Sequence, residues 1–437
     1  MTGGTGIPTP FLDGDLPPEV RDAAGRTAMT VDQAMARAVR QVRPHVIVAC
    51  RDPAGRFGAG PRGGADDRAG GPVFVEAADD REALAIALGA AAGGCRVFAA
   101  IGGQRPGWAT DICHHAGALR LGMVVGLLAR GETGSESAGV LSFRDAPCVQ
   151  LQAEDAQEAY DLVLGAFRVA GDFDLRLPVI VGVPADGGGV LRSVATLSDE
   201  QAALFAGEFA APEDLLDVEH PHGLSMAVDG GAAHALRGQI GAAMRLAAER
   251  IERLGREYEA LTGRPGGMMV CREMDDARIA VVATGPLCRP ARSAVQALRR
   301  EGLAAGLVKL RVLRPFPWRQ LADVLLRPGL GAVCVPDAAV EPGSGGPLFQ
   351  ETAAALAAGA AGRGGDLPRL RSLIIGGASE AAACTELRSV LVELSARSQA
   401  GPQPDPVRFA GWGPIRAGLS EQVEAARGAG QPGEGAS

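Results

Sequence analysis

The sequence has 437 residues, more than one typical domain holds, so two or three domains are expected. Hydrophobic residues make up 47% of the chain, enough to bury sizeable cores, which excludes an intrinsically disordered protein. The net charge of −8 argues against a nucleic-acid or anionic-membrane partner, and no apolar run reaches the roughly 18 residues that span a bilayer.

Short apolar runs then alternate with helical stretches along the chain. Buried strands are predicted at 45–50, 96–101, 122–129, 148–153 and 177–184, and helices at 32–42, 81–92 and 155–173. A long charged helix is predicted at 229–262, where Gly and Pro follow as stop signals. A second series has strands predicted at 278–285, 305–313, 331–337 and 371–377, and helices at 289–302 and 346–358.

Strands that are apolar along their whole length and separated by helices indicate parallel sheets covered on both faces. We therefore predict an α/β protein with two doubly wound domains joined by a helical linker. The Gly- and Pro-rich ends lack periodicity and predict flexible tails. The predicted boundaries are a tail at 1–26, a first domain at 27–215, a linker at 216–275, a second domain at 276–396 and a tail at 397–437.

The eight cysteines are scattered along the chain, and no two of them form a C-x-x-C pair. Metal and iron–sulfur ligands usually cluster more closely, so we expect reduced thiols and no metal held by this chain. The first residues, MTGGTGIPTP, lack the charged start and apolar core of a secretory signal. These features predict a cytoplasmic protein.

A group of acidic residues precedes one predicted helix, in the stretch FVEAADDREALAIALGAAAGG that begins at Phe74. Asp79 is placed to cap this helix, and Glu82, three residues later, is placed to reach back to the cap as in a capping box. Acids at this end also favour the positive pole of the helix dipole. Helix-start chemistry therefore accounts for these acids without any catalytic role.

Several longer motifs occur together in the chain: TVDQAMARAVRQVRPHVIVA, EALAIALGAAAGGCRVFAA, QLQAEDAQEAYDLVLGAFRVA, LPVIVGV, REYEALTGRPGG and KLRVLRPFP. With them the chain resembles the alpha subunits of 2-oxoacid:ferredoxin oxidoreductases, particularly the pyruvate type, over residues 28–395. The resemblance implies a pyrimidine-binding (PYR-type) domain for thiamine diphosphate, followed by a transketolase C-terminal-like domain.

The same resemblance implies partner subunits. A beta subunit would hold the diphosphate, Mg²⁺ and a [4Fe-4S] cluster, and the GDG…N diphosphate motif is indeed absent from this sequence. Gamma and delta-type subunits, ferredoxin or flavodoxin, CoA and a 2-oxoacid complete the implied partners.

Within the acidic group, the resemblance gives Asp80 a catalytic and cofactor-binding role. Counting back from Gly89, Asp80 falls on the position of the family's catalytic glutamate. A carboxylate there shares a proton with a ring nitrogen of the aminopyrimidine, which activates the cofactor. Asp is one methylene shorter than Glu, and a misplacement of about 1 Å can cost on the order of 10²-fold in rate.

Five other positions match the family's pocket. Arg130 is the predicted substrate residue, because a guanidinium fork suits a carboxylate; a solvated arginine at a strand end is the alternative. Gln104, Pro53 and Gly102 match substrate-binding positions, and Ile101 matches a cofactor-binding one. Gln104 is retained, but Pro53 replaces a threonine, and Ile101 with Gly102 replaces a Thr-Ser step.

Two functions of different class remain open. One is an enzyme subunit that supplies half of a thiamine diphosphate site for the CoA-dependent oxidative decarboxylation of a 2-oxoacid. The other is a non-catalytic paralogue that keeps the fold and the subunit interface as a structural or regulatory partner. The altered pocket positions favour the second function, and the retained motifs favour the first.

Overall fold

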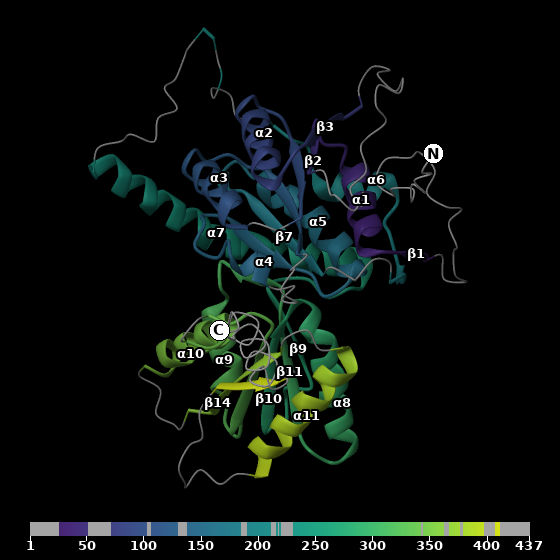
Figure 1. Cartoon of the computed structure of the whole chain (residues 1–437), viewed down its shortest axis with the longest axis vertical. Coiled ribbons are helices and arrows are strands. Elements are labelled where there is room, and N and C mark those ends of the chain that lie inside the picture. Colours follow the sequence, from purple (N-terminus) through teal and green to yellow (C-terminus); the bar gives the residue numbers. More distant parts are fainter. Residues whose placement is uncertain are drawn as a thin grey trace, which may run out of the picture.

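The computed structural model describes residues 26–50, 71–102, 106–129, 138–184, 190–210, 216, 218–219, 230–341, 344–361, 367–375, 379–396 and 407–410. The predicted N-terminal tail therefore lies outside the described residues, apart from Arg26. The described elements form two α/β lobes, one above the other in Figure 1. None of the described helices is both long enough and apolar enough to cross a membrane.

The first lobe is built on a seven-stranded sheet with the order β12-β6-β7-β5-β4-β2-β3. Its strands are β2 (Val46–Cys50), β3 (Val73–Ala77), β4 (Val97–Ile101), β5 (Val124–Ala129), β6 (Val149–Gln152), β7 (Val179–Pro184) and β12 (Val312–Arg314). All neighbouring strands are parallel except β12 and β6. The five predicted strands are confirmed, and β3 is an edge strand that the sequence analysis did not predict.

Helices cover both faces of this sheet, as expected for buried parallel strands. One face carries α1 (Val31–Val42), α5 (Ala156–Ala170) and α6 (Asp199–Ala206), and the other carries α2 (Asp80–Ala92), α3 (Pro106–Ala118) and α4 (Ala138–Leu141). A small antiparallel pair, β1 (Thr27–Met29) with β8 (Arg192–Val194), packs against the first face.

The second lobe contains a six-stranded sheet with the order β15-β14-β13-β10-β11-β9. Its strands are β9 (Met269–Arg272), β10 (Ile279–Thr284), β11 (Ala305–Leu310), β13 (Ala332–Asp337), β14 (Arg369–Ile375) and β15 (Val407–Ala410). A short η1 turn (Gly285–Leu287) follows β10, and the helices are α8 (Cys288–Arg300), α9 (Trp318–Leu325), α10 (Pro347–Ala360) and α11 (Glu380–Ala396). β15 lies within the predicted C-terminal tail, where residues 407–410 pair with β14.

Helix α7 (Gly230–Thr262) connects the two lobes along the chain. The motif REYEALTGRPGG, at its C-terminal end, forms hydrogen bonds with α5. Tyr258 donates a hydrogen bond from its hydroxyl to Asp161 at 2.7 Å, and Arg264 donates two to the same carboxylate at 3.0 Å. The chain then turns back against the helix so closely that a Cβ on Gly255 would lie 1.9 Å from the backbone nitrogen of Gly267. A Cβ on Gly266 would likewise lie 2.1 Å from the carbonyl oxygen of Gly255, so backbone contact requires glycine at both positions.

The predicted strand at 305–313 is wrong in one respect: it is two strands in two different sheets. β11 pairs with β10 in the second lobe, whereas β12 pairs antiparallel with β6 of the first lobe. The change of sheet occurs at Arg311, whose side chain leaves the strand to meet Glu158 at 2.7 Å. The sequence pattern did not predict this break, because the residues on both sides of Arg311 are apolar.

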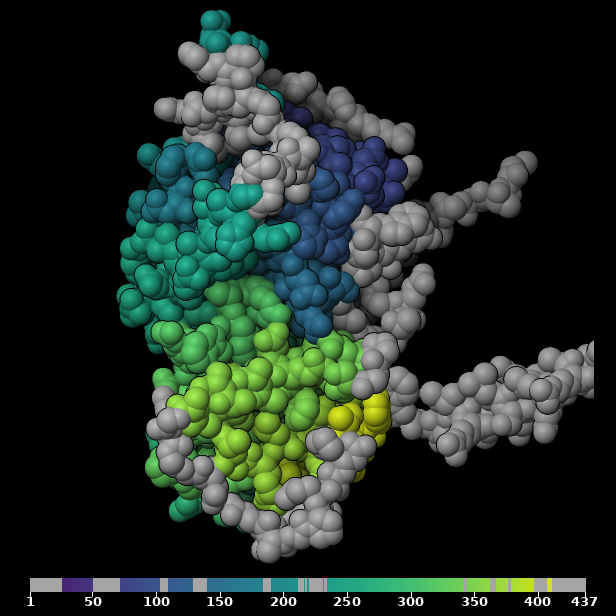
Figure 2. Space-filling model, turned by 90° about the vertical axis from the view of Figure 1, so that its left-hand side faces the viewer, coloured from purple at the N-terminus to yellow at the C-terminus, as the bar shows by residue number. Residues whose placement is uncertain are grey.

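A group of five charged residues, here called the inter-lobe charge cluster, lies beside this crossing, and all of them except Arg292 are largely buried. Glu154 and Glu158 come from the first lobe, and Arg292, Lys309 and Arg311 come from the second. Lys309 Nζ lies 2.6 Å from Glu154 and 2.9 Å from Glu158, and Arg292 donates to both oxygens of Glu154. Figure 2 shows the two lobes in broad contact.

Opposing effects set the pKa values in this cluster. Burial by itself raises the pKa of Glu158, but Lys309 and Arg311 outweigh it, so the carboxyl lies below its usual pKa. Burial lowers the pKa of Lys309, but Glu158 and Glu154 outweigh this and raise it to about 12. Glu158 and Lys309 are therefore both charged at neutral pH.

Asp337, the last residue of β13, is another buried carboxylate and caps α10, the helix that follows it in the chain. Its oxygens accept hydrogen bonds from the backbone N–H groups of Leu348 (2.9 Å) and Phe349 (3.1 Å) at the start of α10. Burial raises the pKa of Asp337 to about 7, an effect that the two amide hydrogen bonds offset only in part.

Asp337 should make stability pH-dependent. Because its folded pKa of about 7 exceeds the usual 3.8, the folded state holds this proton longer than the unfolded state. The stability contribution is therefore complete below pH 3.8 and is lost as the pH rises through 7. Asp337→Asn cannot ionise, so the free energy of unfolding of wild type relative to this variant should fall between pH 3.8 and about 7. Urea unfolding at several pH values measures it, and a constant difference would contradict the assignment.

Candidate active site

The carboxyl ends of β2, β4, β5 and β7 lie along one edge of the first sheet. β2 and β4 are neighbours, but β2 leads along the chain to β3 on one side, and β4 leads to β5 on the other. Open α/β sheets bind ligands outside the carboxyl ends of strands where the strand order reverses in this way. The topology alone therefore places a candidate site at the ends of β2 and β4.

Asp80 lies at this edge. It is the first residue of α2, is only 9% exposed, and accepts a hydrogen bond at 2.8 Å from the backbone N–H of Gly102, the residue after β4. The backbone N–H that follows β4 thus holds the Asp80 carboxylate at the point where the strand order reverses. The sequence analysis marked both residues but did not foresee their contact, because they are distant in the chain.

The other acids at the start of α2 have structural roles. Asp79 is confirmed as the N-cap, since its carboxylate accepts from the backbone N–H of Glu82 at 2.8 Å. Glu82 also reaches back, but its carboxylate accepts from the N–H of Ala78, one residue before the predicted target. Asp79 and Glu82 therefore satisfy the donors of the helix start.

The remaining predicted site residues divide into two groups. The side chain of Ile101 is fully buried among apolar residues beneath α2 and α3, so only the backbone of this strand end is available at the edge. Gly102 is half-buried beside Asp80. Pro53, Gln104 and Arg130 lie outside the described residues, and the strand before Arg130, β5, ends at Ala129.

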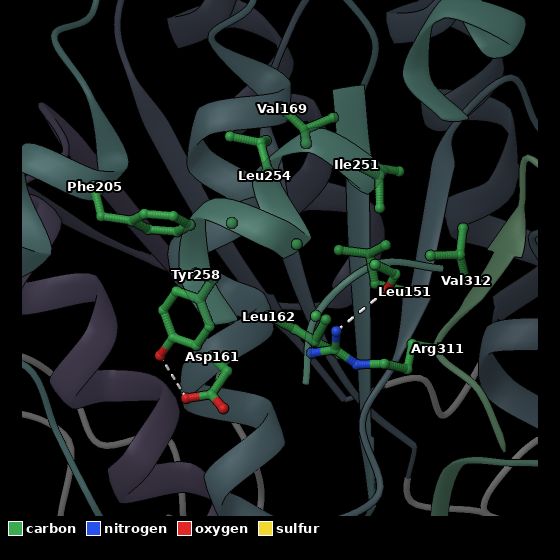
Figure 3. A pocket seen from close by; sticks show the side chains of 14 residues that line it. Leu151, Asp161, Leu162, Val169, Phe205, Ile251, Leu254, Tyr258, Arg311 and Val312 are labelled. Atoms are coloured by element: carbon green, nitrogen blue, oxygen red, sulfur yellow. Dashed lines mark hydrogen bonds between the residues drawn. The ribbon is translucent and has the colours of Figure 1, made fainter. Parts of the chain in front are cut away.

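A separate pocket lies between α5 and α7 (Figure 3). It is open to solvent on one side and is lined mainly by apolar side chains, with Asp161 and Tyr258 hydrogen-bonded to each other at one end. None of the predicted site residues lines it. Among the described residues, no group of three or more His, Cys, Asp or Glu side chains is placed to hold a metal ion.

The two lobes match two family models. Residues 62–256 match the pyruvate flavodoxin/ferredoxin oxidoreductase, thiamine diphosphate-binding model, and residues 277–371 match pyruvate:ferredoxin oxidoreductase core domain II. Asp80 and Gly102 lie within the first of these ranges.

Relatives with similar sequences cover most of the chain. The pyruvate synthase subunit PorA of Thermotoga maritima is 32% identical over 76% of this chain and 86% of its own. The PorA subunit of Methanothermobacter thermautotrophicus is 30% identical over 65% and 75%. The ketoisovalerate oxidoreductase subunit VorA of Pyrococcus abyssi is 27% identical over 69% and 76%.

A solved structure shows the same fold. The 2-oxoglutarate:ferredoxin oxidoreductase of Magnetococcus marinus superposes with a TM-score of 0.60 at 15% identity, over 84% of this chain. This chain spans 65% of the length of that protein. Together with the family models and the PorA relatives, these matches show that the chain belongs to the alpha subunits of the pyruvate/2-oxoacid:ferredoxin oxidoreductase family.

Proposed function

We propose that this chain supplies the aminopyrimidine half of a thiamine diphosphate site for the CoA-dependent oxidative decarboxylation of a 2-oxoacid, with pyruvate as the first candidate. The observation that carries the proposal is the buried carboxylate of Asp80, held by Gly102 at the strand-order reversal. It lies within the part of the chain that matches a thiamine diphosphate-binding domain.

The described residues fit this cofactor. Bound thiamine diphosphate supplies a carbon nucleophile that adds to the carbonyl of a 2-oxoacid and accepts the electrons released when CO₂ leaves. The role of Asp80 is to hold a proton at the pyrimidine ring, and the role of the Gly102 N–H is to fix the direction of that carboxylate. Compared with glutamate, Asp80 reaches less far by one C–C bond, about 1.5 Å.

The division of labour between subunits belongs to the same proposal. A beta subunit holds the diphosphate, Mg²⁺ and a [4Fe-4S] cluster, and gamma and delta-type subunits pass electrons to ferredoxin or flavodoxin. Support comes from the sequence, which has no GDG…N motif and no clustered cysteines. We place this assembly in the cytoplasm.

A non-catalytic paralogue is the second candidate, and a specific observation favours it. Ile101 stands where the family has a hydroxyl, and its side chain is fully buried in the core. Pro53 likewise has neither a hydroxyl nor an N–H to offer. In this case the chain would keep the subunit interface and leave catalysis to another copy.

Reconstitution tests these candidates. The purified chain alone should bind thiamine diphosphate no better than micromolar and contain no iron, whereas the chain assembled with its partner subunits should bind the cofactor and reduce a viologen dye with a 2-oxoacid and CoA. Sub-micromolar binding by the chain alone would contradict the shared site. A loaded assembly that is inactive with every 2-oxoacid would establish the paralogue.

Arg130 should recognise the substrate carboxylate. Arg130→Lys keeps the positive charge but loses the parallel pair of hydrogen bonds, so KM for the 2-oxoacid should rise by about tenfold. Arg130→Ala should raise it further. Steady-state kinetics of the assembled enzyme gives both values, and an unchanged kcat/KM in Arg130→Ala would remove this residue from the site.

A further inference from the structure

The pocket between α5 and α7, here called the α5–α7 pocket, lies beside the place where the chain crosses between the lobes (Figure 3). Its walls come from α5, α6 and α7, from β6, and from the crossing segment itself. Most of the side chains that line it are apolar, among them Leu162, Val169, Phe205 and Leu254. An apolar pocket with a few polar groups is the usual form of a small-molecule site.

Gly165 leaves open space in the wall formed by α5. It lies inside this helix, and a Cβ at its position would meet nothing within 4 Å. By contrast, Gly255 in the wall formed by α7 touches the backbone of Gly267. Glycine is less favourable than alanine inside a helix, and no contact of the described residues requires it at position 165. The missing side chain therefore leaves room for an apolar group from outside the chain.

Arg311 lines the same pocket and is only 5% exposed. Its Nε donates to Glu158 at 2.7 Å, and its Nη1 donates to the backbone oxygen of Gly267 at 3.2 Å. Its Nη2 donates to no acceptor among the described residues, and Figure 3 shows the guanidinium group extending toward Leu162. A carboxylate is the acceptor that suits a guanidinium group best, so the pocket can bind one at this end.

The charge around Arg311 also favours an anion. The inter-lobe charge cluster, to which Arg311 belongs, contains three cationic side chains and only two acidic ones. The carboxylate of Asp161, at the other end of the pocket, is already paired with Arg264 at 3.0 Å. Charges that are largely buried need compensation, so an anion at Arg311 would balance the cluster. An apolar wall beside this positive charge suits a ligand with an anionic head and an apolar tail.

We propose that the α5–α7 pocket binds a small carboxylate that carries a short aliphatic tail. The carboxylate accepts from Nη2 of Arg311, and the tail lies over Gly165 between the two helices. Since Arg311 and Val312 connect the second lobe to β6 of the first, an occupied pocket strengthens the contact between the lobes. The site is separate from Asp80, and the inference does not depend on the proposed function.

A series of small ligands tests the class of compound on the isolated full-length chain. Hexanoate should bind, and butyrate should bind about fifteenfold more weakly, because each buried methylene group contributes a factor of about four. Neutral 1-hexanol should bind at least tenfold more weakly than hexanoate, because it cannot pair with a guanidinium group. Ligand-observed NMR titrations give the affinities. Equal binding of butyrate and hexanoate would exclude the tail site, and equal binding of hexanol and hexanoate would exclude the carboxylate site.

Two variants test the two ends of the pocket separately. Gly165→Leu fills the open space, so it should keep the stability of the chain but weaken hexanoate binding at least tenfold. Gly89→Leu is the matched control, because Gly89 is an exposed glycine inside α2 where a Cβ would also meet nothing within 4 Å. Arg311→Lys keeps a cation beside Glu158 and should lower the preference for hexanoate over hexanol at least threefold. Undiminished hexanoate binding by Gly165→Leu would place the ligand elsewhere and overturn the proposal.

Hydrogen exchange tests whether the ligand acts on the lobe contact. Saturating hexanoate should slow exchange at residues 251–258 and at β12 by at least threefold in wild type and in Gly89→Leu, but not in Gly165→Leu. Protection of residues 251–258 without β12 would contradict the link to the lobe contact. A chain that binds no carboxylate, but whose residues 251–258 become protected when partner subunits are added, would assign the pocket to a partner's side chain instead.

Discussion

Asp80→Asn should abolish exchange of the C2 proton of thiamine diphosphate in the assembled enzyme. An amide cannot share a proton with the pyrimidine nitrogen, but its oxygen can still accept from the Gly102 N–H, so the fold should be kept. The loss should exceed 10²-fold, the scale on which a misplaced catalytic group acts. Proton exchange followed by NMR, with the free energy of unfolding measured in parallel, separates chemistry from stability.

The neighbouring acids provide matched controls. Asp79→Ala removes the helix cap and should cost about 1 kcal/mol of stability while leaving proton exchange unchanged. Asp80→Glu restores the reach typical of the family and should keep or raise the exchange rate. Equal exchange in wild type and Asp80→Asn would mean that Asp80 only starts a helix, and the non-catalytic candidate would then be favoured.

The strands and helices near Asp80 were predictable because their signals are local. Continuous apolar runs mark β2, β4 and β5, and the acids at 79 and 82 mark the start of α2. The contact between Asp80 and Gly102 was not predictable in this way, because it depends on which strand ends lie side by side. Only the resemblance to a family singled out Asp80 from its acidic neighbours.

The second sheet shows the opposite case. KLRVL was predicted as the continuation of a single strand, but β11 ends at Leu310 and β12 begins at Val312. Lys309 and Arg311, beside this break, form ion pairs with the first lobe. Their partners, Glu154 and Glu158, come much earlier in the sequence. Lys309 follows Glu154 by 155 residues, and Arg311 follows Glu158 by 153 residues. Periodicity has no information about pairing over such distances, so the crossing of β12 into the first sheet was missed.

Lys309→Met should destabilise the protein by about 3 kcal/mol or more, because removing one member of a buried ion cluster leaves uncompensated charge. Glu154 and Glu158 would keep Arg292 and Arg311, but they would lose the cation that lies between them. Since the residues of this cluster come from both lobes, losing the ion pairs of Lys309 should weaken the contact between the two lobes. Hydrogen exchange at β12 should accelerate in step with the fall in unfolding free energy.

Charge balance provides the decisive comparison. Lys309→Met combined with Glu158→Gln removes one charge of each sign and should cost less than the sum of the two single variants. Arg388→Met removes a surface pair with Glu301 and should cost at most about 1 kcal/mol.

Because the pKa of Glu158 is lowered below 4.5 and that of Lys309 is raised above 10.5, the contribution of this pair to stability should be constant between these values. It should be lost as the pH falls through the folded pKa of Glu158 or rises through about 12 for Lys309. Strict additivity in urea unfolding at pH 7, with Lys309→Met no worse than Arg388→Met, would show that the inter-lobe charge cluster does not hold the lobes together.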